Sequence, residues 1–142
     1  MTINSSVRFC LNIAKFQTEL NRRLDARLNG IGFNEFIILH HLSLADDHKL
    51  RRIDLAEKVG LTASGITRLL LPMEKIGLIS KEANEHDARV SYVVLAPGGQ
   101  TKLSEGLERM EIFCEDLIPE AKIKKIEEFS DLIIEIGKNI KQ

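Results

Sequence analysis

The sequence predicts a mainly α-helical (α+β) fold, and three observations lead to that prediction. Apolar residues recur every three or four positions near both ends of the chain, which is typical of amphipathic helices. The middle carries two short helical patterns separated by Gly60. Directly behind them, two apolar segments flank the polar stretch "KEANEHDA", which favours a β-hairpin. With 142 residues and no long linker or internal repeat, we expect a single domain over residues 1–142.

The first two helices are expected before the middle segment. The first covers about residues 1–30, and its apolar stripe consists of Phe9, Ile13, Phe16, Leu20 and Leu24. We expect the glycines of "NGIG" to end it in the left-handed conformation. A second helix is expected after Asn34, a candidate N-cap, and it continues to about Ala45. Its apolar residues are Phe36, Ile37, Leu39 and Leu42.

The stretch "RIDLAEKVGLTASGITRLLL" predicts a helix-turn-helix. Ala56 is small where the second helix would cross the first, and Gly60 can adopt the left-handed conformation that ends the first. Thr62 offers a hydroxyl that caps the second helix. Such a pair can also be a mere packing corner, in which the hydroxyls act only as caps.

The outward face of the second helix has the composition of a DNA-reading surface. With Ile66, Leu69 and Leu70 turned inward, small or hydrogen-bonding residues remain outside. These candidate DNA-binding residues are Thr62, Ser64, Gly65, Thr67 and Arg68. Such a face fits a major groove, with the helix N-terminus directed at phosphates or base edges.

Two strands follow the second helix of this pair. The first covers Leu78 to Lys81, and the second, "RVSYVVLA", places Val90, Tyr92 and Val94 on one face. A strand, a polar loop and a strand directly behind a recognition helix form a β-hairpin wing. The sequence therefore predicts a winged helix-turn-helix over about residues 34–96.

Two further helices are expected at the end of the chain, over about residues 99–142. The first stripe consists of Leu103, Leu107, Met110, Cys114 and Leu117, and Pro119 closes it. The second consists of Ile126, Phe129, Ile133, Ile136 and Ile140. These stripes exceed what so small a core can cover, so we interpret residues 1–30 and 99–142 as dimerisation helices. The alternative is packing within one chain.

Composition and charge narrow the class of protein. The formal net charge is −1, but residues 48–92 carry eight basic against six acidic side chains, which makes the centre the best place for an anionic partner. Two distant cysteines, Cys10 and Cys114, suggest half-buried, reduced thiols. The chain has neither a targeting segment nor an apolar run of about 18 residues, so we expect a cytoplasmic protein without membrane contact.

In the order of these parts, and in "LAEKVGLTASGITRLLLPMEKIGLISKEANEHDARVSYVVLAPGG", the sequence resembles the MarR family of bacterial winged-helix regulators. Members carry Asp-x-Arg at the wing, which here is Asp87, Ala88 and Arg89. The resemblance implies a homodimer that binds a pseudo-palindromic double-stranded DNA operator. It also implies a transcriptional repressor that is released by a small, often phenolic or otherwise aromatic effector, or by an oxidant.

The Asp-x-Arg pair has a physical reading at a wing tip. Arg89 can enter the narrow minor groove, where the potential is most negative. Asp87 can accept hydrogen bonds from the guanidinium and hold it extended, so that less rotamer entropy is lost on binding. The alternative is a surface ion pair that contributes about 0 to 1 kcal/mol to stability.

Other residues limit what the resemblance implies. Pro72 removes one backbone donor and is expected to bend the recognition helix behind its reading face. Some relatives sense peroxides through a cysteine near the position of Cys10, but the chain's one tyrosine, Tyr92, lies in the wing. We therefore expect Cys10 to be a packed thiol.

Enzymatic and metal-dependent functions are not expected. His40 and His41 are adjacent and lack a Glu-x-x-His partner, so we expect no catalytic residue, metal or cofactor. Two other functions stay open from the sequence. One is a winged-helix assembly module without sequence-specific DNA binding, and the other is a thiol- or metal-sensing regulator of the same fold.

Overall fold

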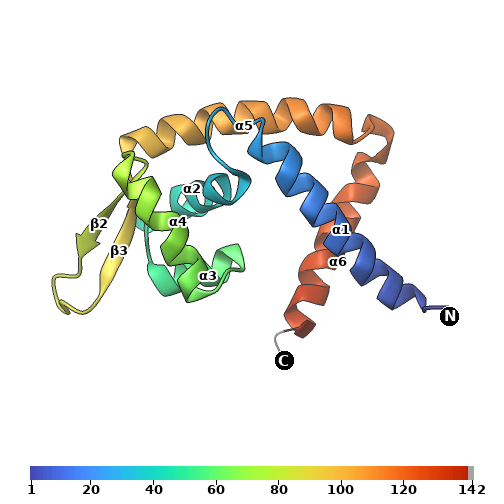
Figure 1. Ribbon diagram of the computed structural model, residues 1–142, viewed down its shortest axis with the longest axis horizontal. Coiled ribbons are helices and arrows are strands. Elements are labelled where there is room, and N and C mark those ends of the chain that lie inside the picture. Colours follow the sequence, from blue (N-terminus) through green and yellow to red (C-terminus); the bar gives the residue numbers. More distant parts are fainter. Residues whose placement is uncertain (141–142) are drawn as a thin grey trace. The chain divides into compact units, whose positions relative to one another are not determined.

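The computed structural model describes residues 1–140 and contains two compact units (Figure 1). Residues 1–109 form unit 1, and the residues from 110 onward form unit 2. The helices of unit 1 are α1 (Ser5–Asp25), α2 (Phe33–Leu44), α3 (Arg52–Val59) and α4 (Ala63–Lys75), together with the 3-10 turn η1 (Asp46–His48). Helix α5 (Pro97–Leu117) begins in unit 1 and ends in unit 2. The turn η2 (Glu120–Lys122) and helix α6 (Ile123–Ile140) follow it. Among the described residues, no helix combines the length and the apolarity that a membrane span requires.

The sheet has three antiparallel strands, although the sequence predicted two. Strands β2 (Ile79–Ala83) and β3 (Ser91–Leu95) form the expected hairpin. Strand β1 (Lys49–Arg51) pairs with the other edge of β3, which gives the order β1-β3-β2. The sequence of β1 is short and carries two charged residues, so no alternating pattern indicates it. The wing is nevertheless a hairpin, and the winged helix-turn-helix prediction is confirmed.

The core of unit 1 lies where α2, α3, α4 and the sheet meet. Its largest fully buried side chains are Leu24, Leu28, Ile38, Leu39, Leu42, Leu55, Ile66, Met73 and Ile79. Strand β3 contributes Val93 and Leu95, whereas Tyr92 and Val94 are half-buried on its other face. In α2 the structure buries Ile38, while Ile37, the residue expected from the sequence, is half-buried. The pattern was misread there because Phe36 to Leu39 form a continuous apolar run, in which periodicity does not show which residue faces the core.

Two glycines allow α5 to lie against the rest of unit 1. A Cβ at Gly99 would clash with the carbonyl oxygen of Leu78, and a Cβ at Gly106 would lie 2.8 Å from the ring of Phe36. The start of α5 therefore packs directly on the backbone that follows α4. Lys102 and Glu105 hold the α1–α2 connection to α5, because Lys102 Nζ donates to the carbonyl of Asn29 and Glu105 accepts from its side-chain amide.

The boundaries of the first two helices differ from the prediction. Helix α1 ends at Asp25 with an ordinary right-handed cap, and the left-handed residues Asn29 and Gly30 lie in the connection beyond it. Helix α2 begins at Phe33 rather than after Asn34. Its free N–H groups are satisfied by side chains, since Asp25 accepts from Phe33 N at 2.7 Å and Glu35 accepts from Gly32 N at 3.3 Å. A cap supplied eight residues upstream leaves no local sequence signal.

Unit 2 consists of the end of α5, η2 and α6. The described residues of α6 include none that is buried, and its apolar stripe remains open to solvent. Ile126, Phe129 and Ile136 are 36%, 39% and 41% exposed, and Ile140 is 83% exposed. Such a stripe on a single chain is an apolar surface without a cover in that chain.

Candidate nucleic-acid interface

The turn between α3 and α4 has the geometry that the sequence predicted. Gly60 ends α3 in the left-handed conformation with φ at 80°, and its N–H donates to the carbonyls of Ala56 and Glu57. Thr62 is the N-cap of α4, and its hydroxyl accepts from Gly65 N at 3.0 Å. The first turn of α4 is thereby fixed, with its remaining N–H groups at the open end of the helix.

The candidate reading residues of α4 fall into two groups. Ser64 and Arg68 are exposed, and the hydroxyls of Ser64 and Thr62 lie 3.3 Å apart. Gly65 and Thr67 are half-buried. The Thr67 hydroxyl donates to the carbonyl of Ala63 at 2.9 Å, a bond within its own helix. Arg68 and Ser64 are therefore the side chains of this face that are best placed to contact a ligand.

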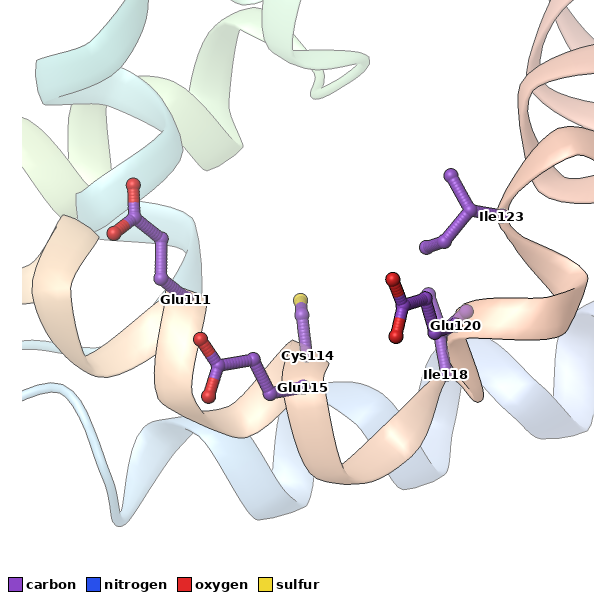
Figure 2. A pocket seen from close by; sticks show the side chains of 6 residues that line it. All are labelled: Glu111, Cys114, Glu115, Ile118, Glu120 and Ile123. Atoms are coloured by element: carbon purple, nitrogen blue, oxygen red, sulfur yellow. The ribbon is translucent and has the colours of Figure 1, made fainter.

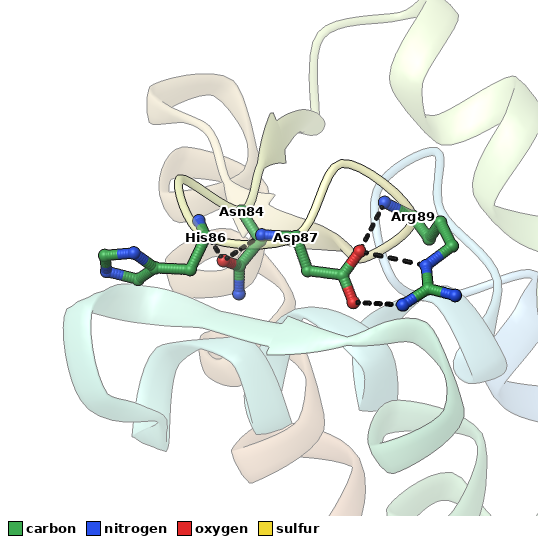
Figure 3. A network of polar contacts seen from close by, with 4 residues as sticks. All are labelled: Asn84, His86, Asp87 and Arg89. Atoms are coloured by element: carbon green, nitrogen blue, oxygen red, sulfur yellow. Dashed lines mark hydrogen bonds and ion pairs between the residues drawn. The ribbon is translucent and has the colours of Figure 1, made fainter.

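Asp87 and Arg89 contact each other at the wing tip (Figure 3). The Asp87 carboxylate accepts from Arg89 Nε at 3.2 Å and from Nη2 at 3.4 Å. It also accepts from the backbone N–H of Arg89 at 3.0 Å. The guanidinium of Arg89 and then its backbone N–H hold the pKa of Asp87 below the ordinary value. The Arg89 side chain is 91% exposed, so the pair presents an oriented cation on the surface.

Asn84 organises the loop beneath this pair. Its side-chain oxygen accepts from His86 N at 2.8 Å and from Asp87 N at 3.2 Å, as Figure 3 shows. Its amide group donates to the hydroxyl of Tyr92 on β3 at 3.0 Å. The sequence analysis did not identify Asn84 or Tyr92 as functional. The signal available was weak, namely an Asn at the start of a polar turn, where its side chain can bond the backbone two residues on.

Comparison with known proteins matches the segment that contains the helix-turn-helix and the wing loop. A family model described as the MarR family matches residues 33–91, which run from the start of α2 through α3 and α4 to the first residue of β3. Over this segment the chain is similar to the MarR family.

Individual proteins that are similar to this chain also have names that describe transcriptional regulators. The chain is 28% identical to the HTH-type transcriptional repressor YetL of Bacillus subtilis, over 72% of this chain and 62% of that protein. It spans about two thirds of the length of the curated relatives that it matches. The transcriptional regulator BldR from Sulfolobus solfataricus has the same fold, with a TM-score of 0.82, 21% identity and coverage of 95% of this chain and 98% of that one. Sco3205, a MarR-family regulator from Streptomyces coelicolor solved in complex with DNA, has a TM-score of 0.75 at 19% identity, over 95% and 90% of the two chains.

Lys49 is a further basic residue, and it lies at the foot of the wing. Its ammonium lies 3.1 Å from the carboxylate of Glu82 and 4.9 Å from the centre of the Tyr92 ring. The hydrogen bond to Glu82 is the main cause that raises the pKa of Lys49. Sequence reasoning missed this contact because it depends on the unpredicted pairing of β1 with β3.

His40 and His41 lie edge to face, with ring centres 5.5 Å apart. Burial, then His40 and Lys58, lower the pKa of His41, which favours its neutral form near neutral pH. His41, Lys49 and Lys58 line a cavity of about 400 Å³ at the end of α2. Within residues 1–140, no group of three His, Cys, Asp or Glu side chains is placed to hold a metal ion.

The two cysteines differ in exposure. Cys10 is exposed in the chain by itself, so the expectation of a packed thiol is wrong there, because α1 leaves this side of the helix uncovered. Cys114 is half-buried as expected, and burial raises the pKa of its thiol. It lies in unit 2 in a cavity of about 530 Å³, with Glu111, Glu115, Ile118, Glu120 and Ile123 as the other lining residues (Figure 2). A raised pKa disfavours the reactive thiolate.

Proposed function

We propose that the protein is a DNA-binding transcriptional regulator that contacts DNA through α4 and the wing. In this proposal Arg68 and Ser64 reach base edges in the major groove, while Thr62, Gly65 and Thr67 shape the helix start beside the phosphates. Arg89 enters the adjacent minor groove, and Asp87 orients it.

The observation that carries the proposal is the hydrogen-bonded Asp87–Arg89 pair on a hairpin next to a capped helix. An exposed Arg that is already oriented loses less rotamer freedom on binding than a mobile one. Arg52, Lys58, Arg68 and Lys75 are also exposed in the helix-turn-helix segment, where Glu57 is the exposed acidic residue, so the exposed charge of this segment is mainly basic. This distribution favours a polyanionic partner over a protein-assembly role.

The proposal includes a homodimer on a pseudo-palindromic operator. Two copies of α4 related by a two-fold axis would read two half-sites about one helical turn apart. Each unit has exposed apolar residues that such a dimer would bury, namely the stripe of α6 in unit 2, and residues of α1 such as Leu11 and Phe16 in unit 1. Removal of this apolar area from water is the driving force for association.

Repression and effector release belong to the same proposal. We infer a cytoplasmic repressor that leaves its operator when a small phenolic or other aromatic molecule binds. The name of YetL, a transcriptional repressor, supports the direction of regulation. A thermal-shift screen with small phenols and oxidants checks the effector, because a ligand that binds the folded state raises its thermal midpoint.

A gel-shift selection tests the function itself. The full chain is mixed with genomic fragments of its own source, and we expect it to retain a few fragments selectively. The apparent affinity should fall steeply as salt increases, because phosphate contacts release counterions. If no fragment is retained even at low salt, the assembly-module function replaces this proposal. Selective retention that is insensitive to salt would contradict the assigned basic contacts.

A further inference from the structure

The wing tip is held by a chain of contacts that begins in the sheet. Tyr92 lies on β3, the central strand, where it is paired with Glu82 on one side and with Arg51 on the other. The Lys49 ammonium lies over its ring and is bound to Glu82. Tyr92 is therefore fixed by both neighbouring strands and by a cation above its face.

Asn84 transfers this fixed position to the loop. Its amide donates to the Tyr92 hydroxyl, and its oxygen accepts from the backbone of His86 and Asp87. Two N–H donors can only face the oxygen end of the amide, so the orientation of the side chain is determined. Below it, the backbone closes the loop, since Asn84 N donates to Val90 O and Val90 N donates to Asp87 O, each at 3.0 Å.

Asp87 is thereby held at its backbone N–H by Asn84 and at its carboxylate by Arg89. The order of contacts is Tyr92, Asn84, Asp87 and Arg89, and each link is a hydrogen bond between 3.0 and 3.2 Å. The loop is otherwise exposed, with Glu85, His86 and Ala88 open to solvent. In Figure 3 the ring of His86 points away from the Asp87–Arg89 pair.

We propose that Asn84 and Tyr92 are positioning residues for Arg89, which determine where its guanidinium meets DNA. This inference rests on the proposed function. Neither residue needs to touch DNA, because both act through Asp87. Loss of either link leaves the cation in place but lets the loop sample more conformations, so binding must order it again.

The variants that test this inference remove single links. Tyr92→Phe deletes one hydroxyl and keeps the ring under Lys49, whereas Asn84→Ala removes all three side-chain bonds. Ser80→Ala is the matched control, because it removes a hydroxyl from an exposed position of the same hairpin. The probe is the genomic duplex that the unaltered full-length protein retains best. We expect Tyr92→Phe to weaken its binding by roughly 3- to 10-fold and Asn84→Ala by more, with Ser80→Ala unchanged.

A double-mutant cycle separates positioning from general destabilisation. In an Arg89→Ala background, Asn84→Ala and Tyr92→Phe should have little further effect on binding, since there is no guanidinium to position. Equal effects in both backgrounds overturn the inference. If Arg89→Ala itself leaves binding intact, the proposed role of Arg89 fails instead, so the two failures are distinguishable.

A measurement without DNA completes the test. The NMR order parameter of the Arg89 Nε–H bond should fall in Asn84→Ala and, to a smaller extent, in Tyr92→Phe, while Ser80→Ala leaves it unchanged. An order parameter that is the same in all four proteins overturns the inference, whatever the DNA result.

Discussion

Asp87 holds Arg89 at two places, because its carboxylate accepts both the backbone N–H and the guanidinium of that residue. The pair is therefore part of the loop structure as well as a surface ion pair. Several properties of the protein depend on this arrangement.

The titration of Asp87 should report the pair directly. Its pKa lies below the ordinary value of 3.8, first because of the guanidinium of Arg89 and then because of its backbone N–H. A carboxyl with a lowered folded pKa contributes stability that is present above pH 3.8 and lost as the pH falls through the lowered value. We expect Arg89→Ala to raise the pKa toward 3.8 without fully restoring it, since the backbone bond remains. Carbon-detected NMR titration checks this, and Arg68→Ala is the control that should change nothing.

Arg89→Ala should weaken operator binding strongly. A minor-groove Arg contributes about 1 to 3 kcal/mol per arm, and a dimer has two arms, so we expect a loss of roughly 30-fold or more. The plot of log affinity against log salt should become shallower by about 1 to 2 units. Arg89→Lys should recover the salt slope but only part of the affinity, because the ammonium lacks the planar fork. Unchanged affinity and slope in Arg89→Ala would reduce the pair to a surface contact.

Asp87→Ala should weaken binding less than Arg89→Ala, because the cation remains. The double variant should nevertheless be slightly worse than Arg89→Ala alone, since Asp87 also accepts the backbone N–H at residue 89. A gel-shift cycle of the four proteins measures the coupling. Full additivity would contradict the direct contact between the two side chains.

Alanine substitutions in and next to α4 should separate effects on operator binding from effects on folding stability. The residues to substitute are Arg68, Ser64 and Thr62. Arg68→Ala and Ser64→Ala remove exposed side chains, so they should weaken operator binding while the thermal midpoint stays nearly constant. Thr62→Ala removes the N-cap bond to Gly65 N and should cost about 1 kcal/mol of folding stability. Thermal unfolding and gel shift on the same samples distinguish the two effects. Binding that survives both Arg68→Ala and Ser64→Ala would move recognition away from this face.

Ile136→Glu should disrupt the proposed dimer. Ile136 lies in the exposed stripe of α6, and a charge there would be buried in any partner that covers it. We expect a monomer by light scattering and loss of binding to a two-half-site duplex. Asn139→Glu, which adds the same charge at an exposed polar position of α6, should stay dimeric. Truncation after Pro119 should likewise give a monomeric or aggregating protein, and a soluble dimer from that truncation would place the interface elsewhere.

Local features of this chain could be predicted from its sequence, and contacts between distant segments could not. Gly60 and Thr62 were assigned correctly because a left-handed terminator and an N-cap are properties of a few neighbouring residues. Two other contacts leave no local pattern in the sequence. One is the hydrogen bond by which Asp25 caps α2 from eight residues upstream, and the other is the pairing of β1 with β3. The Asn84–Tyr92 bond depends on the register of the hairpin, and a shift of the register by one residue would abolish this bond. The DNA-contact roles of the α4 and wing residues stay predictions.

The wing loop is closed at its base by a backbone hydrogen bond between its two ends. The backbone bond from Asn84 N to Val90 O closes the loop of residues 85–89 at its base, and β1 pairs with the far edge of β3. We therefore expect that a tip of different sequence, grafted between Asn84 and Val90 with both residues and Tyr92 retained, would leave the strand register below it unchanged. Under the proposed function, exchange of this short loop is a route to a new operator preference, in the laboratory or by descent, while the folding core stays the same.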